Sequence, residues 1–160
     1  MEITLFEPRI PQNTGNIARS CAAFDIPLNL IEPLGFKIED KYLKRAGLDY
    51  WPLVEVKKYE NFIKFLESKS SNRVISFSKK NGIYLKNFNF QENDILLFGR
   101  EDSGLPENII DKSDFLISIF MPNIQTGNND QKGVRSLNLS VACGIAIYEA
   151  HKQINFQNGN

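Results

Sequence analysis

Short apolar runs, each followed by a loop rich in glycine and small polar residues, are the feature of this sequence that most constrains its fold. The clearest run is 94–98 (D-I-L-L-F), which has no polar position after its first residue. An uninterrupted apolar strand is typical of a sheet that is buried on both faces. Further strands are expected at 3–6, 28–31, 53–56, 73–77 and 115–119. About six strands that alternate with helices predict an α/β fold with a mainly parallel sheet flanked by helices.

The expected helices lie between these strands. In the first helix, Ile17, Cys21 and Phe24 recur at helical spacing, and Asn13 or Thr14 is expected to cap its amino end. This helix connects the first two strands, and the β-α-β order favours a parallel sheet. Other helices are predicted at 60–69, from 106 onward, and at 136–151. A chain of 160 residues suits one domain, which we assign to residues 1–154, with a disordered tail at 155–160.

Composition argues against several classes of protein. The two cysteines, Cys21 and Cys143, lie in apolar helical segments, so we expect buried reduced thiols and a cytoplasmic location. His151 is the single histidine and no Cys/His cluster occurs, so no metal site is expected. We find neither a signal peptide nor an apolar run of the roughly 20 residues that span a bilayer, and expect no membrane partner. The net charge is zero, so any contact with nucleic acid requires a local basic patch.

Basic and aromatic residues are interleaved between positions 36 and 51. Lys41, Lys44 and Arg45 lie in a predicted short helix, close in sequence to Tyr50 and Trp51. This combination suits a nucleic-acid surface, through phosphate contacts and base stacking. A solvated helix face beside buried aromatic residues explains the same pattern, and this stretch alone leaves both interpretations open.

In an open parallel sheet, ligands bind beyond the carboxyl ends of the strands. The segments expected at this edge are N-T-G-N-I-A-R, S-K-K-N-G, G-R-E-D-S-G-L-P and V-R-S-L-N-L-S. Neither a G-x-G-x-x-G nor a G-K-[ST] phosphate loop is present, and no histidine is placed as the base of a serine hydrolase. The segments therefore predict a site of backbone and small polar groups, which suits a reaction whose reactivity is carried by a cofactor. Ser136 or Asn138 is also expected to cap the last helix.

Three of these segments occur in the order of the signature motifs of the SPOUT-class RNA 2′-O-methyltransferases, which they resemble: N-T-G-N-I-A-R, F-G-R-E-D-S-G-L-P and V-R-S-L-N-L-S-V-A. The opening F-E-P-R-I-P-Q-N-T-G-N-I-A-R-S-C-A and the segment I-E-P-L-G-F…K-R-A-G-L-D-Y are similar to the small single-domain tRNA (cytidine/uridine-34)-2′-O-methyltransferases. The resemblance implies a C-terminal deep trefoil knot and a homodimer whose active site forms at the subunit interface. It also implies methylation of the ribose 2′-hydroxyl of the wobble nucleotide in tRNA.

The same resemblance implies a cofactor and a set of site residues. The cofactor is S-adenosylmethionine, with contacts, largely through main-chain groups, at Phe77, Gly99, Gly104, Ile119, Ser136 and Leu137. The catalytic residues are Arg19, Asn13, Glu101, Ser136 and Asn138, and the RNA-binding residues are Lys41, Lys44 and Arg45. Because free arginine is almost always protonated, Arg19 is either a base in an unusual environment or an electrostatic activator of the hydroxyl. Glu101 is expected to orient Arg19 or the ribose.

Two alternatives to this function remain open at the level of sequence. One keeps the chemistry and changes the substrate to rRNA or to another tRNA position. The other is a non-catalytic RNA-binding protein on the same fold. The chain also departs from the compact family members between residues 121 and 134, where its loop is several residues longer. Since this loop precedes the expected cofactor-binding turn, it is expected to affect substrate choice.

Overall fold

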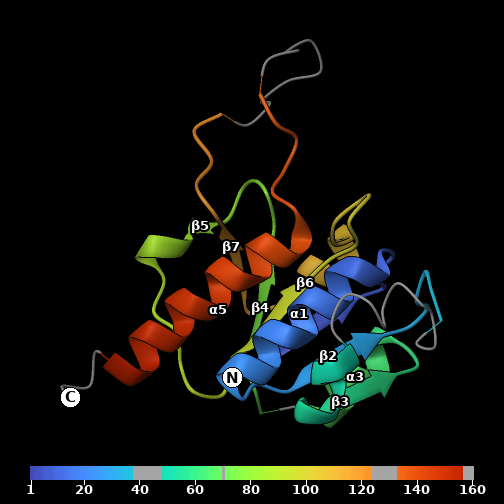
Figure 1. The fold of residues 1–160 in the computed structure, drawn as a ribbon. Coiled ribbons are helices and arrows are strands. Elements are labelled where there is room, and N and C mark those ends of the chain that lie inside the picture. The colour runs from blue at the N-terminus through green and yellow to red at the C-terminus, as the bar shows by residue number, and fades with distance from the viewer. Residues whose placement is uncertain (38–47, 70, 124–132, 157–160) are drawn as a thin grey trace.

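The computed structural model describes residues 1–37, 48–69, 71–123 and 133–156. Within these residues, seven strands form one sheet in the order β3-β2-β1-β6-β4-β7-β5 (Figure 1). Their bounds are β1 (Glu2–Phe6), β2 (Leu28–Ile31), β3 (Val56–Tyr59), β4 (Val74–Phe77), β5 (Ile83–Tyr84), β6 (Ile95–Phe98) and β7 (Phe115–Ser118). Every pairing between them is parallel. The predicted single-domain α/β fold with a parallel sheet is confirmed.

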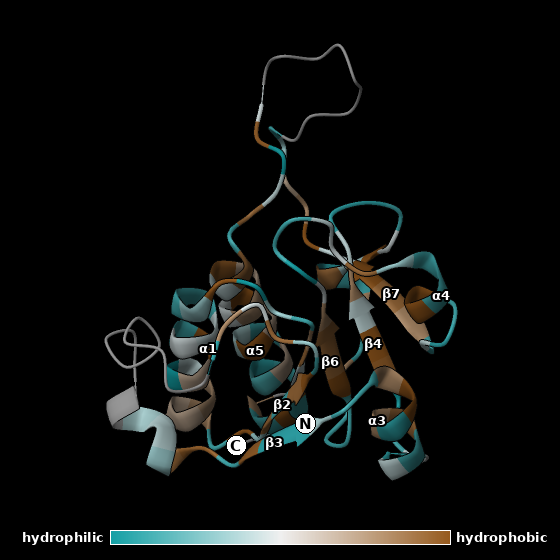
Figure 2. Ribbon diagram, turned by 90° about the vertical axis from the view of Figure 1, so that its right-hand side faces the viewer, coloured by the Kyte–Doolittle hydropathy of each residue, from teal (hydrophilic) through white to brown (hydrophobic). Residues whose placement is uncertain are grey.

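Helices cover both faces of the sheet. The two long helices, α1 (Pro11–Phe24) and α5 (Leu139–Phe156), lie together on one face, and the short helices α3 (Phe62–Ser68) and α4 (Glu107–Ile110) lie on the other (Figure 2). Two 3₁₀ helices, η1 (Leu48–Leu53) and η2 (Leu85–Asn87), complete the described elements. Among these helices, none has the length and apolar character needed to cross a membrane.

Strand β6 shows how the sheet divides the core. Leu96 and Phe98 belong to the larger apolar cluster, which packs under α1 and α5. Ile95 and Leu97 belong to the smaller cluster, which packs against α3. All four side chains are at most 2 % exposed. The uninterrupted apolar sequence of this strand therefore corresponds, as predicted, to burial on both faces.

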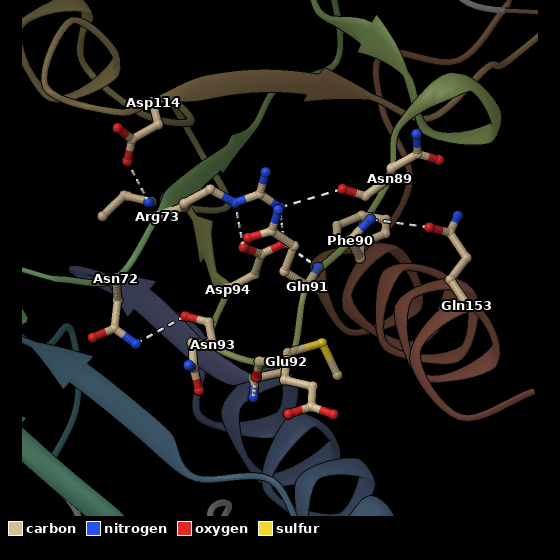
Figure 3. A network of polar contacts seen from close by, with 12 residues as sticks. Asn72, Arg73, Asn89, Phe90, Gln91, Glu92, Asn93, Asp94, Asp114 and Gln153 are labelled. Atoms are coloured by element: carbon tan, nitrogen blue, oxygen red, sulfur yellow. Dashed lines mark hydrogen bonds and ion pairs between the residues drawn. The ribbon is translucent and has the colours of Figure 1, made fainter. Parts of the chain in front are cut away.

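A polar network fastens the amino ends of β4 and β6 (Figure 3). Arg73 donates to both carboxylate oxygens of Asp94, at 2.7 Å each, and the backbone amide of Gln91 donates to the same carboxylate at 2.8 Å. Asp94 is only 1 % exposed. Next to this network, the amide of Phe90 donates to the side-chain carbonyl of Gln153 on α5, at 3.0 Å. The loop before β6 is therefore tied both to the sheet and to the last helix.

A second ion pair lies at the amino end of β1. The carboxylate of Glu2 accepts hydrogen bonds from Lys69 Nζ and from Asn29 Nδ2, at 2.7 Å each. Burial alone would raise the pKa of the Glu2 carboxyl, but these hydrogen bonds outweigh it, so this pKa lies below its ordinary value. Glu2 therefore contributes to stability as a charged group.

Cys21 on α1 and Cys143 on α5 are both free and buried, as the sequence predicted. Burial raises the pKa of the Cys21 thiol to about 12 and raises the pKa of the Cys143 thiol well above its ordinary value. Both thiols therefore remain protonated and act as small apolar groups between the two helices.

Two predictions about strands were wrong. The strand expected at 53–56 is displaced: residues Leu48–Leu53 form η1, which contains Pro52, and β3 begins only at Val56. Leu53 is 67 % exposed, so the apolar pattern here belongs to a turn of helix that is only partly buried. The sequence analysis also missed β5, because its two residues are both exposed and give no apolar run.

The helix ends also differ from the prediction. Helix α1 begins at Pro11, so Asn13 and Thr14 lie inside it and neither is its cap. Proline suits a first helical position, because the missing amide would have no partner there. Helix α5 begins at Leu139, later than expected, and its last two residues fall in the segment predicted as a disordered tail. Residues 157–160 lie outside the described part of the chain.

Candidate active site

Because the strands are parallel, the loops that follow β1, β4, β6 and β7 leave the sheet at one edge (Figure 1). Helix α1 starts from the same edge after β1, and α5 starts nearby after residues 133–138. Polar side chains from α1, from the loop after β6 and from the start of α5 contact one another here. This edge of the sheet therefore holds the candidate site.

The loop after β6 is a tight turn closed by its own backbone. The Arg100 amide donates to the Gly104 carbonyl at 3.1 Å, and the Gly104 amide donates to the Arg100 carbonyl at 2.8 Å. A Cβ on Gly99 would lie 2.2 Å from the carbonyl carbon of Gly104, so only glycine fits there. Gly104 has φ +74°, and the space around it is open on the side where a Cβ would project. This turn places Glu101 opposite the amino end of α1.

Glu101 replaces the missing side-chain cap of α1. Its carboxylate accepts hydrogen bonds from the backbone amides of Arg9 (2.8 Å) and Ile10 (3.2 Å). Ile10 is the N-cap residue and makes no capping bond with its own side chain. A carboxylate at this position satisfies orphan amides and is stabilised by the positive end of the helix dipole. The first helix therefore begins where a loop about 90 residues further along the chain meets it.

Asn13 connects this carboxylate to the last helix. Its Nδ2 donates to Glu101 Oε1 at 3.1 Å, and its Oδ1 accepts from Asn138 Nδ2 at 3.0 Å. Asn138 Oδ1 in turn accepts from the amide of Ser140 at 2.8 Å, so Asn138 caps α5 as predicted. Three of the predicted catalytic residues, one from each motif, therefore form a continuous chain of hydrogen bonds, Glu101–Asn13–Asn138.

Arg19 lies apart from this chain of hydrogen bonds. It is exposed on α1, and its guanidinium carbon lies 4.8 Å from the ring centroid of Tyr50 in η1. Six residues of helix separate it from Asn13, which corresponds to about 9 Å along the axis. Glu101 contacts the amino end of α1 and therefore lies at a different level of the helix from Arg19. The sequence analysis did not foresee that a tyrosine ring would support Arg19, since their separation of 31 positions carries no local signal.

The residues predicted to contact the cofactor end the strands or begin the following loops. The Phe77 ring stacks on Phe98 at 4.5 Å and 15°, so it points into the core and leaves its backbone at the edge. Ile119 and Leu137 are half-buried, whereas Ser136 is exposed. Gly99 and Gly104 form the closed turn. This arrangement suits recognition by main-chain groups rather than by side chains.

Charged residues surround the turn, and the sequence analysis did not single them out. Arg100 forms a two-pronged pair with Asp102, at 2.9 and 2.8 Å, and lies 3.6 Å from Glu7. Hydrogen bonds from Arg100 and Ser103 hold the pKa of the Asp102 carboxyl well below its usual range. Glu7 also pairs with Arg9 at 3.0 Å. Glu7 follows β1 directly, which is the signal that could have placed it at this edge.

Two further predictions concern RNA and metal. Lys41, Lys44 and Arg45 lie outside the described residues. Tyr50 and Trp51, their aromatic neighbours in sequence, belong to η1 and are half-buried. In the part of the chain that the structure describes, no group of three or more His, Cys, Asp or Glu residues could hold a metal ion.

The fold and this site correspond to one class of RNA-modifying enzyme. The model of the SpoU rRNA methylase family matches residues 1–148, and the chain belongs to this family. A relative from Aeromonas hydrophila, named tRNA (cytidine(34)-2′-O)-methyltransferase, is 40 % identical over 156 residues, which cover 98 % of this chain and 96 % of the relative. A solved structure concerned with the 2-OH methylation of C/U34 on tRNA is 44 % identical, with a TM-score of 0.87 over 99 % of this chain and 97 % of that one.

More distant structures share the fold. The SpoU methyltransferase AviRb from Streptomyces viridochromogenes, solved in complex with AdoMet, is 20 % identical, with a TM-score of 0.79. The match covers 96 % of this chain and 57 % of AviRb. The family match and the relatives of about 40 % identity confirm the resemblance to this methyltransferase class that the three motifs indicated.

Proposed function

We propose that this chain transfers a methyl group from S-adenosylmethionine to the ribose 2′-hydroxyl of nucleotide 34 in tRNA. The observation that carries this proposal is the chain of hydrogen bonds Glu101–Asn13–Asn138, which joins the three motifs into one site. The names of relatives that match almost the whole chain support the choice of tRNA and of position 34. A tRNA substrate and two reduced thiols are consistent with a cytoplasmic enzyme.

The residues at the sheet edge fit the cofactor. A Cβ on Gly104 would meet nothing within 4 Å, and the Phe77 ring is turned into the core, so both residues offer backbone groups rather than side chains to a ligand. We assign the cofactor contacts to Phe77, Gly99, Gly104, Ile119, Ser136 and Leu137. When bound, S-adenosylmethionine supplies a methyl group that its sulfonium already activates. The protein therefore has to position the acceptor hydroxyl and to stabilise the charge that develops on it.

Arg19 takes the electrostatic part in this proposal. It is exposed and rests on the Tyr50 ring, so its guanidinium is accessible to the RNA. A fixed positive charge attracts a backbone phosphate and makes the neighbouring ribose hydroxyl more acidic. Asn13, Glu101, Ser136 and Asn138 shape the pocket, and the hydrogen bonds among three of them fix its geometry. Lys41, Lys44 and Arg45 are assigned to tRNA binding, on the basis of sequence alone.

A homodimer is part of the proposal, because α5 carries an uncovered apolar stripe. Val141, Ile145 and Tyr148 recur at helical spacing and are 49, 39 and 62 % exposed. Gly144 lies within the stripe and leaves room for the close approach of another helix. The stripe borders a cavity of about 490 Å³. We expect Ile145→Glu to convert the dimer to a monomer in analytical ultracentrifugation, whereas Ile63→Glu, at an exposed position on α3, leaves it dimeric.

The deep trefoil knot belongs to the proposal as well, and family membership supports it. The chain returns from β7 toward α5 through a closed base, where the Val134 amide donates to the Asn123 carbonyl at 2.8 Å. Gly133 has φ +99°, and a Cβ there would lie 2.7 Å from the Asn123 carbonyl oxygen. Residues 133 and 134 are thereby held against Asn123 before the chain continues to α5.

The function is tested by transfer of labelled methyl groups to tRNA from cells that lack this protein, followed by mapping of the methylated nucleotides. We expect a single 2′-O-methylated nucleotide, at position 34. The Arg19→Ala variant should no longer methylate this nucleotide but should still bind the cofactor. Lys112→Ala, an exposed cation elsewhere, serves as the control and keeps full activity. Methylation of rRNA or of another tRNA position supports the first alternative. If Arg19→Ala leaves the RNA function of the chain unchanged, this supports the second alternative, a non-catalytic RNA-binding protein.

A further inference from the structure

An exposed aromatic pair lies at the edge strand of the sheet. The rings of Tyr84, at the end of β5, and Phe120, just after β7, meet edge to face, 5.7 Å apart and at 90°. Tyr84 is 46 % exposed and Phe120 is 63 % exposed, and Ile83 beside them is 45 % exposed. We call Tyr84 and Phe120 the edge platform. Exposed apolar groups that are clustered in this way mark a surface that a partner covers.

The loop before the edge platform is attached to β7 at both of its ends. Its first amide, that of Ser78, donates to the Ile117 carbonyl at 2.9 Å, and the hydroxyl of Ser118 donates to the Gly82 carbonyl at 3.2 Å. A Cβ on Gly82 would lie 2.6 Å from the carbonyl carbon of Ile117, so the loop packs directly on the strand. Residues 78–82 are therefore anchored on β7 at both ends.

This loop carries positive charge to the edge platform. Lys79 and Lys80 are exposed and lie five and four residues before Tyr84, respectively, and Lys86 follows Tyr84 by two residues. Within the described ranges, none of these three lysines forms an ion pair with a carboxylate. Unpaired cations a few residues from exposed rings are complementary to a single-stranded nucleic acid, whose phosphates and bases alternate along one strand.

We propose that the edge platform stacks an unpaired base of the RNA substrate, next to the nucleotide that is methylated, while Lys79 and Lys80 contact the adjoining phosphates. Phe120 directly follows Ile119, and Lys79 and Lys80 lie two and three residues after Phe77, so these contacts adjoin the proposed cofactor site in the sequence. This inference rests on the proposed function, since it assigns a second contact to the same substrate. It selects RNA with bases that are free to stack and disfavours continuous duplex.

The aromatic contact is tested by the affinity of the purified chain for an anticodon stem-loop, measured by fluorescence anisotropy. Tyr84→Ala and Phe120→Ala should each weaken binding roughly 5- to 150-fold, which is the range for loss of one base–aromatic stack. Tyr84→Phe and Phe120→Tyr retain the rings and should restore affinity. Phe156→Ala, at an exposed aromatic residue at the carboxyl end of α5, is the matched control. Cofactor affinity should be unchanged in all variants.

The phosphate contact is tested by salt dependence. Lys79→Gln and Lys80→Gln should each lower the slope of log affinity against log salt concentration by about 0.7, the value for one phosphate contact with a single strand. Lys112→Gln, at an exposed lysine after α4, should leave the slope unchanged. Duplex RNA of equal length should bind more weakly than the stem-loop and should show no effect of Tyr84→Ala.

Three results would overturn the inference. The first is equal affinity of the alanine variants and the unaltered chain for the stem-loop. The second is absence of stem-loop binding by the unaltered chain. The third is dissociation into monomers on Phe120→Ala in ultracentrifugation, which would show that a second copy covers the platform. The proposed function is decided separately by methyl transfer: a chain that binds the stem-loop through the platform but methylates no tRNA contradicts that function alone.

Discussion

The hydrogen bonds of Glu101 allow a quantitative prediction. Glu101→Ala removes the acceptor of three hydrogen bonds, from the amides of Arg9 and Ile10 and from Asn13 Nδ2, at 2.8, 3.2 and 3.1 Å. It also removes the negative charge at the amino end of α1. Hydrogen bonds to charged groups contribute about 1.5–3 kcal/mol each when buried, and a charge at a helix end contributes about 0.3–1 kcal/mol.

The expected loss of stability is smaller than the sum of these contributions, because Glu101 is only half-buried and water replaces part of each bond. We expect the free energy of unfolding to fall by about 2–4 kcal/mol. For a chain of this length, that corresponds to a fall in Tm of roughly 5–15 °C. Asp102→Ala, which truncates a neighbouring exposed carboxylate in the same turn, is the control and should change stability little.

A double-mutant cycle with Asn13→Ala isolates the bond between the two side chains. Urea denaturation of the unaltered chain, both single variants and the double variant should give a coupling energy of about 1 kcal/mol. The double variant should also release Asn138, which loses its partner on α1. A coupling energy near zero, with Glu101→Ala no more destabilising than Asp102→Ala, would refute the assignment of Glu101 as the cap and connector of α1.

Three further predictions concern stability and reactivity. Asp94→Ala leaves a guanidinium and a backbone amide without their acceptor (Figure 3), so we expect a loss of about 2–3 kcal/mol in urea denaturation, whereas Glu67→Ala in an exposed ion pair leaves stability nearly unchanged. The pKa of the Glu2 carboxyl is lowered in the folded protein. The stabilisation that this carboxylate contributes is therefore fully present above its unfolded pKa of about 4.3 and is lost as the pH falls through the folded pKa. Glu2→Gln should be less stable than the unaltered chain at pH 7, and this difference should vanish in strong acid. Cys21 and Cys143 should resist a thiol reagent in the folded protein and react fully in guanidinium, and rapid labelling of the native chain at pH 8 would contradict their burial.

The sequence predicted best those strands that are covered by apolar side chains on both faces. The run D-I-L-L-F identifies β6 because both faces of that strand are covered, so every position is apolar. Strand β3 lies at the edge of the sheet and exposes two lysines. Its sequence therefore lacks the apolar run that is typical of a buried strand. The strand was for this reason predicted too early in the chain, over Leu53 and Val54.

The motifs indicated that three polar residues would lie together, but the sequence did not show how their side chains connect. The order of the three motifs identified Asn13, Glu101 and Asn138, and the structure joins them by hydrogen bonds. The local pattern suggested Asn13 as the cap of α1. The carboxylate of Glu101, from another loop, instead accepts the amide of the N-cap residue Ile10, and Asn13 lies inside the helix, where its side chain can bond to neighbouring segments. The support of Arg19 by Tyr50 and the pairing of Tyr84 with Phe120 likewise depend on residues far apart in sequence, which periodicity does not reveal.

The bond between Asn13 and Asn138 spans 125 positions of the chain, and this has a consequence for the order in which the protein is made. A ribosome adds about 5–20 residues per second, amino end first. Helix α1 and the turn that carries Glu101 are therefore synthesised several seconds before α5 exists. Until then, Glu101 is the one of the two side-chain partners of Asn13 that has been synthesised. The nascent chain can therefore complete the hydrogen bonds among Glu101, Asn13 and Asn138 only after α5 has been made, close to the end of its synthesis.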